Sequence, residues 1–270
     1  MYRSRISSFI GLGLPSDAPA LMLFVGILSL LTASAATAEE GTCSLAELDG
    51  DSTGARQLGY DAVVAVARRE EWACTGVVVS ADRVLTAAHC LPATHILVGD
   101  DIRQPRDIVS VSDTVRHPEA DVAVLILAEE LQNISPVEVR HSVDNTMPSV
   151  LLRHVGFGSR DPQGRLGFGR KKIVDLPLSR WGCHPSEAEF RGCDPRHEMV
   201  IGAAGGLDTC TGDSGGPLLE LATIDGTCSW RIVGLTSRAA AFARVACGHG
   251  GIYVRMERIQ EWLSEVIEPG

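Results

Sequence analysis

The sequence has no excess of positive charge, no Cys-x-x-Cys pair and no internal repeat. Its formal net charge is −10 at pH 7, and nucleic-acid binding depends on basic patches, so the composition argues against a nucleic-acid partner. The histidines and cysteines show no spacing typical of zinc sites, so we expect neither a metal nor another cofactor. No low-complexity stretch or long linker is present, which argues against separate, independent domains.

Residues 1–38 are predicted to be a signal peptide. Arg3 and Arg5 give the segment a positive start, and its apolar run, residues 21–31, is too short to span a bilayer comfortably. Small residues at 36–38 match a cleavage site. The alternative is an uncleaved membrane anchor. With the signal removed, the protein is expected to be secreted, extracellular or periplasmic, without membrane contact.

From residue 59 onward the sequence predicts an all-β domain, after a polar lead-in or short propeptide at 39–58. Short β-branched runs recur at close spacing, which is typical of antiparallel barrels or sandwiches. These runs are 62–67, 76–79, 84–85, 95–98, 108–111 and 122–127, and then 150–155, 172–176, 217–221, 231–236 and 251–254. They predict two barrels, roughly 59–140 and 141–255, with the site between them. Apolar residues at helical spacing predict a helix over 256–267.

The most distinctive stretch is Asp208–Leu218, in which Ser214 is flanked by glycines. Glycine lets the chain turn sharply and lets a substrate approach the backbone. The N–H groups near Ser214 can then point at one spot, as a developing oxyanion requires. The alternative is a glycine-rich surface turn with an incidental serine, so a base and an orienting acid must also be found.

Two further motifs supply such partners. His89 lies at the tip of a small-residue bend after a strand-like run, and Asp121 opens the very apolar run 121–127. Taken alone, His89 also fits the role of a packed structural histidine, and Asp121 that of an acid at the end of a strand. A histidine can take the proton of a serine hydroxyl, and a buried aspartate can orient that histidine. Together, in the order His, Asp, Ser, the three predict a catalytic triad.

The chain resembles the trypsin/chymotrypsin-like serine proteases from about residue 59 to about 267. The motifs that carry the resemblance are Leu85–Cys90, Asp121–Leu125 and Cys210–Pro217. The resemblance implies two packed six-stranded antiparallel β-barrels followed by a C-terminal α-helix. It also implies that Ser214 is the nucleophile, His89 the general base and acid, and Asp121 the orienting carboxylate. The N–H groups of Gly212 and Ser214 would form the oxyanion hole.

The resemblance also implies a primary pocket for Arg or Lys at the P1 position of the substrate. Asp208 stands where trypsin-like members have the acid at the pocket base, and Ser237 and Gly251 match its walls. The alternative is that Asp208 is a solvated loop acid. Arg238 and Ala239 stand where Trp-Gly is usual, and extra residues follow, so subsites beyond P1 are not predicted. The expected partners are protein or peptide substrates with a basic P1 residue, with protein inhibitors as possible further partners.

Eight cysteines in an exported chain predict disulfides. The resemblance implies one bridge that braces the histidine loop and one that ties the serine loop to the far wall of the pocket. A third pair is expected to close a local loop, and the remaining two cysteines are paired by elimination only. In this order the pairs are Cys74–Cys90, Cys210–Cys247, Cys183–Cys193 and Cys43–Cys228.

The sequence departs from the family most clearly at its activation site. In the family, cleavage before an Ile-Val-Gly-Gly-like start frees an α-ammonium group, which pairs with the aspartate before the nucleophile, here Asp213. Counting back from His89 by the family's usual spacing places this start at Leu48, which follows Glu47. The segment that begins there matches Ile-Val-Gly-Gly poorly. One hypothesis is that the Leu48 ammonium pairs with Asp213 in a processed zymogen. The alternative is that another cation or backbone N–H groups satisfy Asp213, and that the protein is active from Glu39 onward.

We therefore predict a secreted serine endopeptidase that acts through an acyl-enzyme. One alternative is a catalytically silent or weakly active binding module on the same fold. A second is a hydrolase of small esters with the same triad on another fold. The order His, Asp, Ser argues against the α/β-hydrolases, in which the serine comes first.

Overall fold

The computed structural model describes residues 43, 60–69, 71–140, 151–164, 166–178, 181–202, 208–224 and 226–267 of the 270-residue chain. The predicted signal peptide, the lead-in apart from Cys43, and Leu48 lie outside the described residues. All described residues belong to one compact body, residues 41–270, which contains two β-sheet units. In the described part of the chain, no helix is long and apolar enough to cross a membrane.

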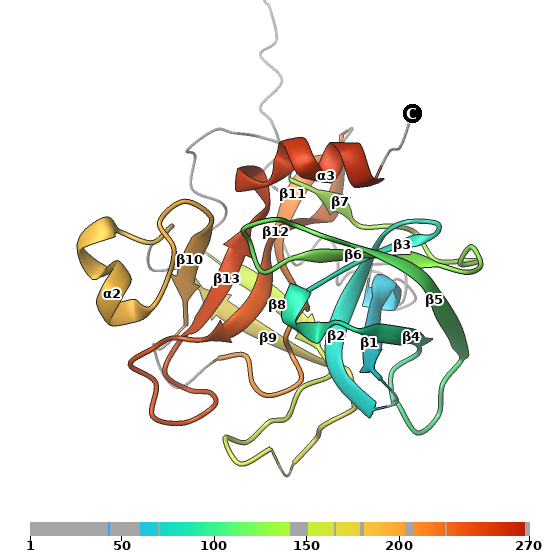
Figure 1. The fold of residues 1–270 in the computed structure, drawn as a ribbon, viewed down its shortest axis with the longest axis horizontal. Helices are drawn as coiled ribbons and strands as arrows, with labels where there is room; N and C mark the ends of the chain where they lie inside the picture. Colours follow the sequence, from blue (N-terminus) through green and yellow to red (C-terminus); the bar gives the residue numbers. More distant parts are fainter. Residues whose placement is uncertain are drawn as a thin grey trace, which may run out of the picture. The chain divides into compact units, whose positions relative to one another are not determined.

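Six antiparallel strands close into a barrel in the order β1-β2-β3-β6-β5-β4 (Figure 1). The strands are β1 (Val63–Arg68), β2 (Glu71–Ser80), β3 (Arg83–Thr86), β4 (Ala93–Val98), β5 (Asp107–Arg116) and β6 (Ala123–Leu127), with 3-10 turns η2 (Tyr60–Ala62) and η3 (Ala88–Cys90). β1 is buried at five of its six positions. Its apolar run is continuous rather than alternating because β1 also contacts β8 of the second unit.

The second unit is an open sheet in the order β10-β13-β12-β11-β8-β9, with β7 paired in parallel to β12. Its strands are β7 (Glu138–Val139), β8 (Leu151–Gly156), β9 (Lys172–Pro177), β10 (Glu198–Ile201), β11 (Pro217–Ile224), β12 (Thr227–Ala239) and β13 (Gly251–Arg255). Between β9 and β10 lie the short turns η4 (Pro185–Glu187) and α2 (Ala188–Arg191). The predicted two-unit all-β fold is confirmed, with a half-barrel as its second unit.

The C-terminal helix is confirmed as a 3-10 turn, η5 (Met256–Arg258), followed by α3 (Gln260–Ile267). α3 lies beside β7 (Figure 1), and residues of both elements line a small common cavity. Leu263 of α3 is fully buried and belongs to the main hydrophobic core. That core also contains residues of β1–β6 and of β11–β13. The largest core therefore spans both units, and a second, smaller core lies within the second unit.

All four expected disulfides are present. Cys74–Cys90 and Cys210–Cys247 close short segments of the chain, with sequence separations of 16 and 37. Cys183–Cys193 closes a local loop with a separation of 10. Cys43–Cys228, which the sequence paired only by elimination, connects the start of the chain to β12. Disulfides of this density fit an extracellular protein.

Candidate active site

Strand pairing brings His89 and Asp121 together. β3 and β6 are antiparallel neighbours with Thr86 opposite Ala123, so the end of β3 lies beside the start of β6. His89 follows β3 in η3, and Asp121 precedes β6. The Nδ1 atom of His89 lies 2.8 Å from Oδ2 of Asp121, and the His89 backbone N–H donates to Oδ1 at 3.0 Å. Both contacts fix the orientation of the imidazole ring.

A third group stabilises the Asp121 carboxylate. The hydroxyl of Ser237 donates to Oδ2 of Asp121 at 2.6 Å. Burial raises the pKa of Asp121, but hydrogen bonds from His89 and Ser237 outweigh it and hold the pKa at about 2. An ionised carboxylate only accepts hydrogen bonds. Nδ1 of His89 therefore carries the proton, which leaves Nε2 free to accept one. Ser237, expected in the pocket wall, is thus also a partner of Asp121.

Ser214 lies in the same cavity as His89 and Asp121. The cavity has a volume of about 730 Å³ and is lined by all three residues and by Gly212. The Ser214 hydroxyl donates to the carbonyl of Ser237 at 3.3 Å. A serine hydroxyl reorients by rotation about one bond, and catalytic hydrogen bonds often tighten only when substrate binds. The structure thus brings the three predicted triad residues to one cavity.

The loop around Ser214 is fixed against the first barrel. The N–H of Thr75 in β2 donates to the Ser214 carbonyl at 2.9 Å, and the Thr75 hydroxyl donates to the Gly212 carbonyl at 2.8 Å. Gly212 has φ +97°, which a side chain would disfavour. Among the described residues, no acceptor takes the N–H of Gly212 or of Ser214. Both groups remain available to an oxyanion.

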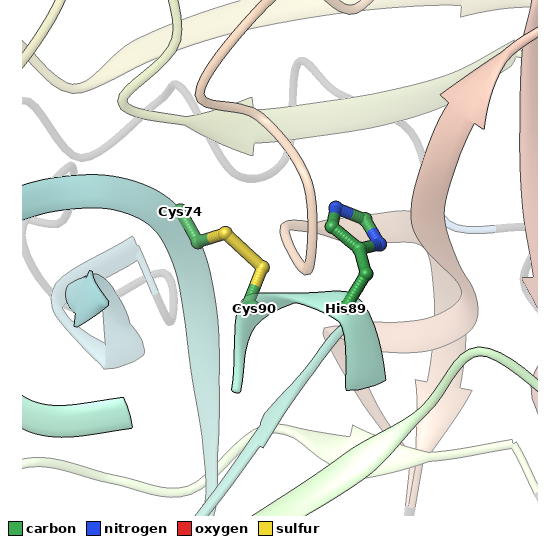
Figure 2. Close-up of side chains that lie close together, drawn as sticks. All are labelled: Cys74, His89 and Cys90. Carbon is green, nitrogen blue, oxygen red and sulfur yellow. A yellow bond between two sulfur atoms is a disulfide. The ribbon is translucent and has the colours of Figure 1, made fainter. Parts of the chain in front are cut away.

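The disulfide Cys74–Cys90 lies directly beside the His89 ring (Figure 2). The two sulfur atoms and one ring nitrogen lie within 4.8 Å of one another, a grouping that would suit a metal ion. Metals bind cysteine as the thiolate, whereas these sulfur atoms are bonded to each other. The disulfide therefore braces the turn that carries His89, and the cluster is not a metal site.

Asp208 and Gly251, both predicted for the primary pocket, are neighbours, but neither of them lines the cavity of Ser214. A Cβ atom added to Gly251 would lie 3.2 Å from Oδ1 of Asp208. The Asp208 carboxylate accepts the N–H groups of Thr209, Gly248 and Gly250 at 2.8, 3.0 and 2.9 Å. Burial outweighs these hydrogen bonds and raises its pKa. Asp208 lines a second cavity of about 410 Å³, which shares Cys210 with the cavity of Ser214.

The profile of the trypsin family matches residues 49–263. The chain belongs to the trypsin family. It is 28% identical to a vitellin-degrading protease of Bombyx mori over 221 residues, 76% of this chain and 80% of that protein. It is 26% identical to trypsin 5G1 of Aedes aegypti over 208 residues, 72% of this chain and 74% of that protein. It is 23% identical to trypsin alpha of Drosophila erecta over 260 residues, 90% and 97% of the two chains. By class the chain is a trypsin-like serine protease, whose substrates are proteins or peptides.

This trypsin-family chain carries Arg238 at the cavity wall, where an aromatic residue is usual. The guanidinium forms two hydrogen bonds with Glu198 at 2.6 and 2.9 Å and donates to the Ser237 hydroxyl at 3.0 Å. Sequence reasoning missed Glu198 because it missed β10. The only signal was Arg238 itself, a charged residue where the family usually has tryptophan, which implies a partner acid without naming it.

Asp213, which directly precedes Ser214, is fully buried. Nζ of Lys172 lies 2.5 Å from its Oδ2, and Nε2 of His154 lies 3.3 Å from its Oδ1. The N–H groups of Gly158 and Cys210 donate to Oδ1 and Oδ2, each at 2.8 Å. Burial raises the pKa of Asp213, but its interactions with His154 and Lys172 hold it well below the ordinary value. Sequence reasoning named neither Lys172 nor His154 as a partner of Asp213.

Proposed function

We propose that the chain is a secreted endopeptidase that hydrolyses peptide bonds through His89, Asp121 and Ser214. The observation that carries the proposal is the oriented imidazole, with Nδ1 2.8 Å from Asp121 and with Ser214 on the same cavity. In this assignment residues 59–270 form the peptidase domain, and residues 1–38 are removed on export. The four disulfides support an oxidising compartment.

Each residue then has a defined role in two steps. Nε2 of His89 takes the Ser214 proton while Oγ attacks the substrate carbonyl, and the protonated ring next gives that proton to the leaving amine. Asp121 stabilises the imidazolium that forms in between. The N–H groups of Gly212 and Ser214 stabilise the oxyanion, and one such donor is typically worth about 2.7–4 kcal/mol. Water then hydrolyses the acyl-enzyme by the same route.

The test of this assignment uses Ser214→Ala and His89→Ala, with Ser229→Ala at an exposed position of β12 as the matched control. We expect the first two variants to lose peptide hydrolysis by several orders of magnitude and the control to keep it. A fluorophosphonate probe should label the wild type and the control but not Ser214→Ala. A folded wild type that neither cleaves peptides nor takes the probe would instead be a silent binding module. Peptide cleavage that persists in purified Ser214→Ala would refute the role of Ser214.

We further propose that Asp208 selects Arg or Lys at P1, with Ser237 and Gly251 shaping the pocket. The Asp208 carboxylate is held by the backbone N–H groups of Thr209, Gly248, His249 and Gly250, which compensate its burial only in part, so a substrate cation would gain a charge-assisted contact there. The P1 side chain must reach this position from the cavity of Ser214, past Cys210. A cation desolvated there without Asp208 would lack a partner.

A positional-scanning peptide library tests this specificity. We expect the wild type to prefer Arg and Lys at P1, and Asp208→Ser to lose such substrates by a large factor in kcat/KM. Asp113→Ser is the control, because exposed Asp113 also accepts the N–H of the residue that follows it. A wild-type preference for Phe, Leu or Ala at P1 would show that Asp208 is only a structural acid.

A further inference from the structure

We propose that Lys172 supplies the buried positive charge that orders the oxyanion loop, with His154 packed beside the same carboxylate, so that the protein is active on folding without N-terminal cleavage. Lys172 is on this view a positioning residue, since it acts through Asp213 and does not contact the reacting atoms. The inference rests on the proposed protease function and adds to it how the site is switched on.

The need for a buried positive charge comes from Asp213, which directly precedes Ser214. Its side chain is fully buried, and a buried carboxylate costs several kcal/mol unless a cation and hydrogen-bond donors compensate it. The Asp213 N–H donates to the Cys210 carbonyl at 3.0 Å, and the Asp213 carbonyl accepts the Gly216 N–H at 2.8 Å. The position of Asp213 therefore sets the backbone on both sides of Ser214, including the N–H of Gly212.

The cation comes from the β8–β9 pair. His154 and Lys172 lie on these neighbouring strands, where Lys172 is opposite Gly156. Successive residues of a strand point to opposite faces. Lys172 accordingly points inward, with its side chain only 6% exposed against Asp213. Its neighbour Lys171 instead binds the carbonyl of Tyr60 and pairs with exposed Asp100.

The surrounding backbone is shaped to hold the Asp213 carboxylate. A Cβ atom on Gly156 would lie 2.4 Å from Oδ1 of Asp213, and one on Gly158 would lie 2.5 Å from its Cγ. Only glycine at both positions leaves room for the carboxylate beside Lys172 and His154. The arrangement is a formed site in which Gly156 and Gly158 place no side chain against Asp213.

Another ammonium group would have to compete with the groups that already surround the Asp213 carboxylate. A carboxylate offers about four acceptor positions. Oδ1 faces His154 and the Gly158 N–H, and Oδ2 faces Lys172 and the Cys210 N–H. An incoming α-ammonium group would have to displace Lys172 or His154. Of the two hypotheses drawn from the sequence, the contacts thus favour another cation over the Leu48 ammonium.

The first experiment uses the wild-type chain starting at Glu39, with its intact N-terminus verified by sequencing and mass spectrometry. We expect this uncut protein to hydrolyse peptides and to take the fluorophosphonate probe, and Leu48→Asp to do the same. If the uncut protein is inactive and becomes active after cleavage, the present inference fails while the protease function stands. If no form is active or labelled, the protease function itself fails. This measurement holds whether or not the variants below fold.

The second experiment compares Lys172→Met, Lys172→Arg and the matched control Lys171→Met. We expect Lys172→Met to lower kcat by about a hundredfold or more, comparable to the loss of an oxyanion donor, with a smaller change in KM. Lys172→Arg should restore part of kcat, and Lys171→Met should leave it near the wild-type value. Full activity in folded Lys172→Met would overturn the role of Lys172.

A chemical complementation separates the charge of Lys172 from its packing. Lys172→Ala lacks three carbon atoms and the ammonium nitrogen, which together correspond to propylammonium. We expect propylammonium to restore activity in a saturable way, and 1-propanol, which has the same chain without the charge, to have no effect. Rescue by propanol, or no rescue in a variant whose circular dichroism matches the wild type, would show that the cation is not what orders the loop.

Discussion

Replacing Gly215 by alanine should destabilise the fold and disable the site at once. Gly215 follows Ser214 and has φ +81°. An added Cβ atom would lie 2.3 Å from the Thr75 carbonyl oxygen, 2.3 Å from Oγ1 of Thr86 and 2.7 Å from the Ala87 nitrogen. Two of these atoms are backbone, and the Thr86 hydroxyl is held by its own hydrogen bond to the Thr75 carbonyl. None can yield without moving the first barrel against the nucleophile loop.

The expected magnitude has two parts. A left-handed conformation costs a residue with a Cβ atom about 1–2 kcal/mol, and overpacking a tight site costs about 1–3 kcal/mol. Gly215→Ala should therefore lower the free energy of unfolding by about 2–5 kcal/mol, which corresponds to about 4–20 °C in Tm. Gly226→Ala is the matched control, because Gly226 has φ +76° and no atom within 4 Å of the position that a methyl group would take.

Urea unfolding of both variants, in a Ser214→Ala background that prevents self-digestion, measures the two costs. Gly226→Ala should show only the conformational cost of about 1–2 kcal/mol, so the difference between the variants isolates the steric cost. In the active background, Gly215→Ala should also lose kcat while Gly226→Ala keeps it. If the two variants are equally stable, the nucleophile loop is not packed against β2 as described.

Two further predictions concern charged groups. The pKa of Asp121 falls from 3.8 to about 2 on folding, so its ionised form adds up to about 2 kcal/mol of stability above pH 4. This contribution is lost as the pH falls through 2. The urea midpoint of Asp121→Asn should therefore change less between pH 5 and pH 2 than that of the wild type. Glu220, with a side chain only 4% exposed, pairs with Arg140 and Arg231, so Glu220→Gln should cost about 3 kcal/mol. Glu119→Gln, at an exposed ion pair, should cost less than about 1 kcal/mol in the same assay.

The sequence was sufficient for the fold class and for bringing the three triad residues together. The apolar runs 84–85 and 122–127 lie within or next to β3 and β6, and the antiparallel pairing of those strands places His89 beside Asp121. The glycine pattern around Ser214 reflects a physical need, because Gly215 adjoins backbone that excludes a Cβ atom. Sequence patterns and steric limits within short segments were therefore enough to predict this part of the site.

Long-range partners could not be predicted in the same way. β10 has only four residues and begins with Glu198, so it lacks the length and alternation that identify a strand. Its role depends on Arg238, 40 residues away in the chain. Lys172 is separated from Asp213 by 41 residues, and the pattern of two adjacent lysines does not say which one points inward. Such pairs are set by sheet register, which a single sequence does not state.

The disulfides suggest what would control a protease that needs no cleavage. Cys74–Cys90 braces the turn that carries His89, and Cys210–Cys247 ties down the loop that carries Asp213 and Ser214. Neither bridge persists in a reducing compartment, so the two halves of the site would there be held only by packing and by hydrogen bonds such as those of Thr75. If Lys172 orders the oxyanion loop as proposed, folding and oxidation are enough to form it and no new N-terminus is required. Control over activity would then lie in export to an oxidising compartment, where both bridges form, rather than in the release of a new N-terminus.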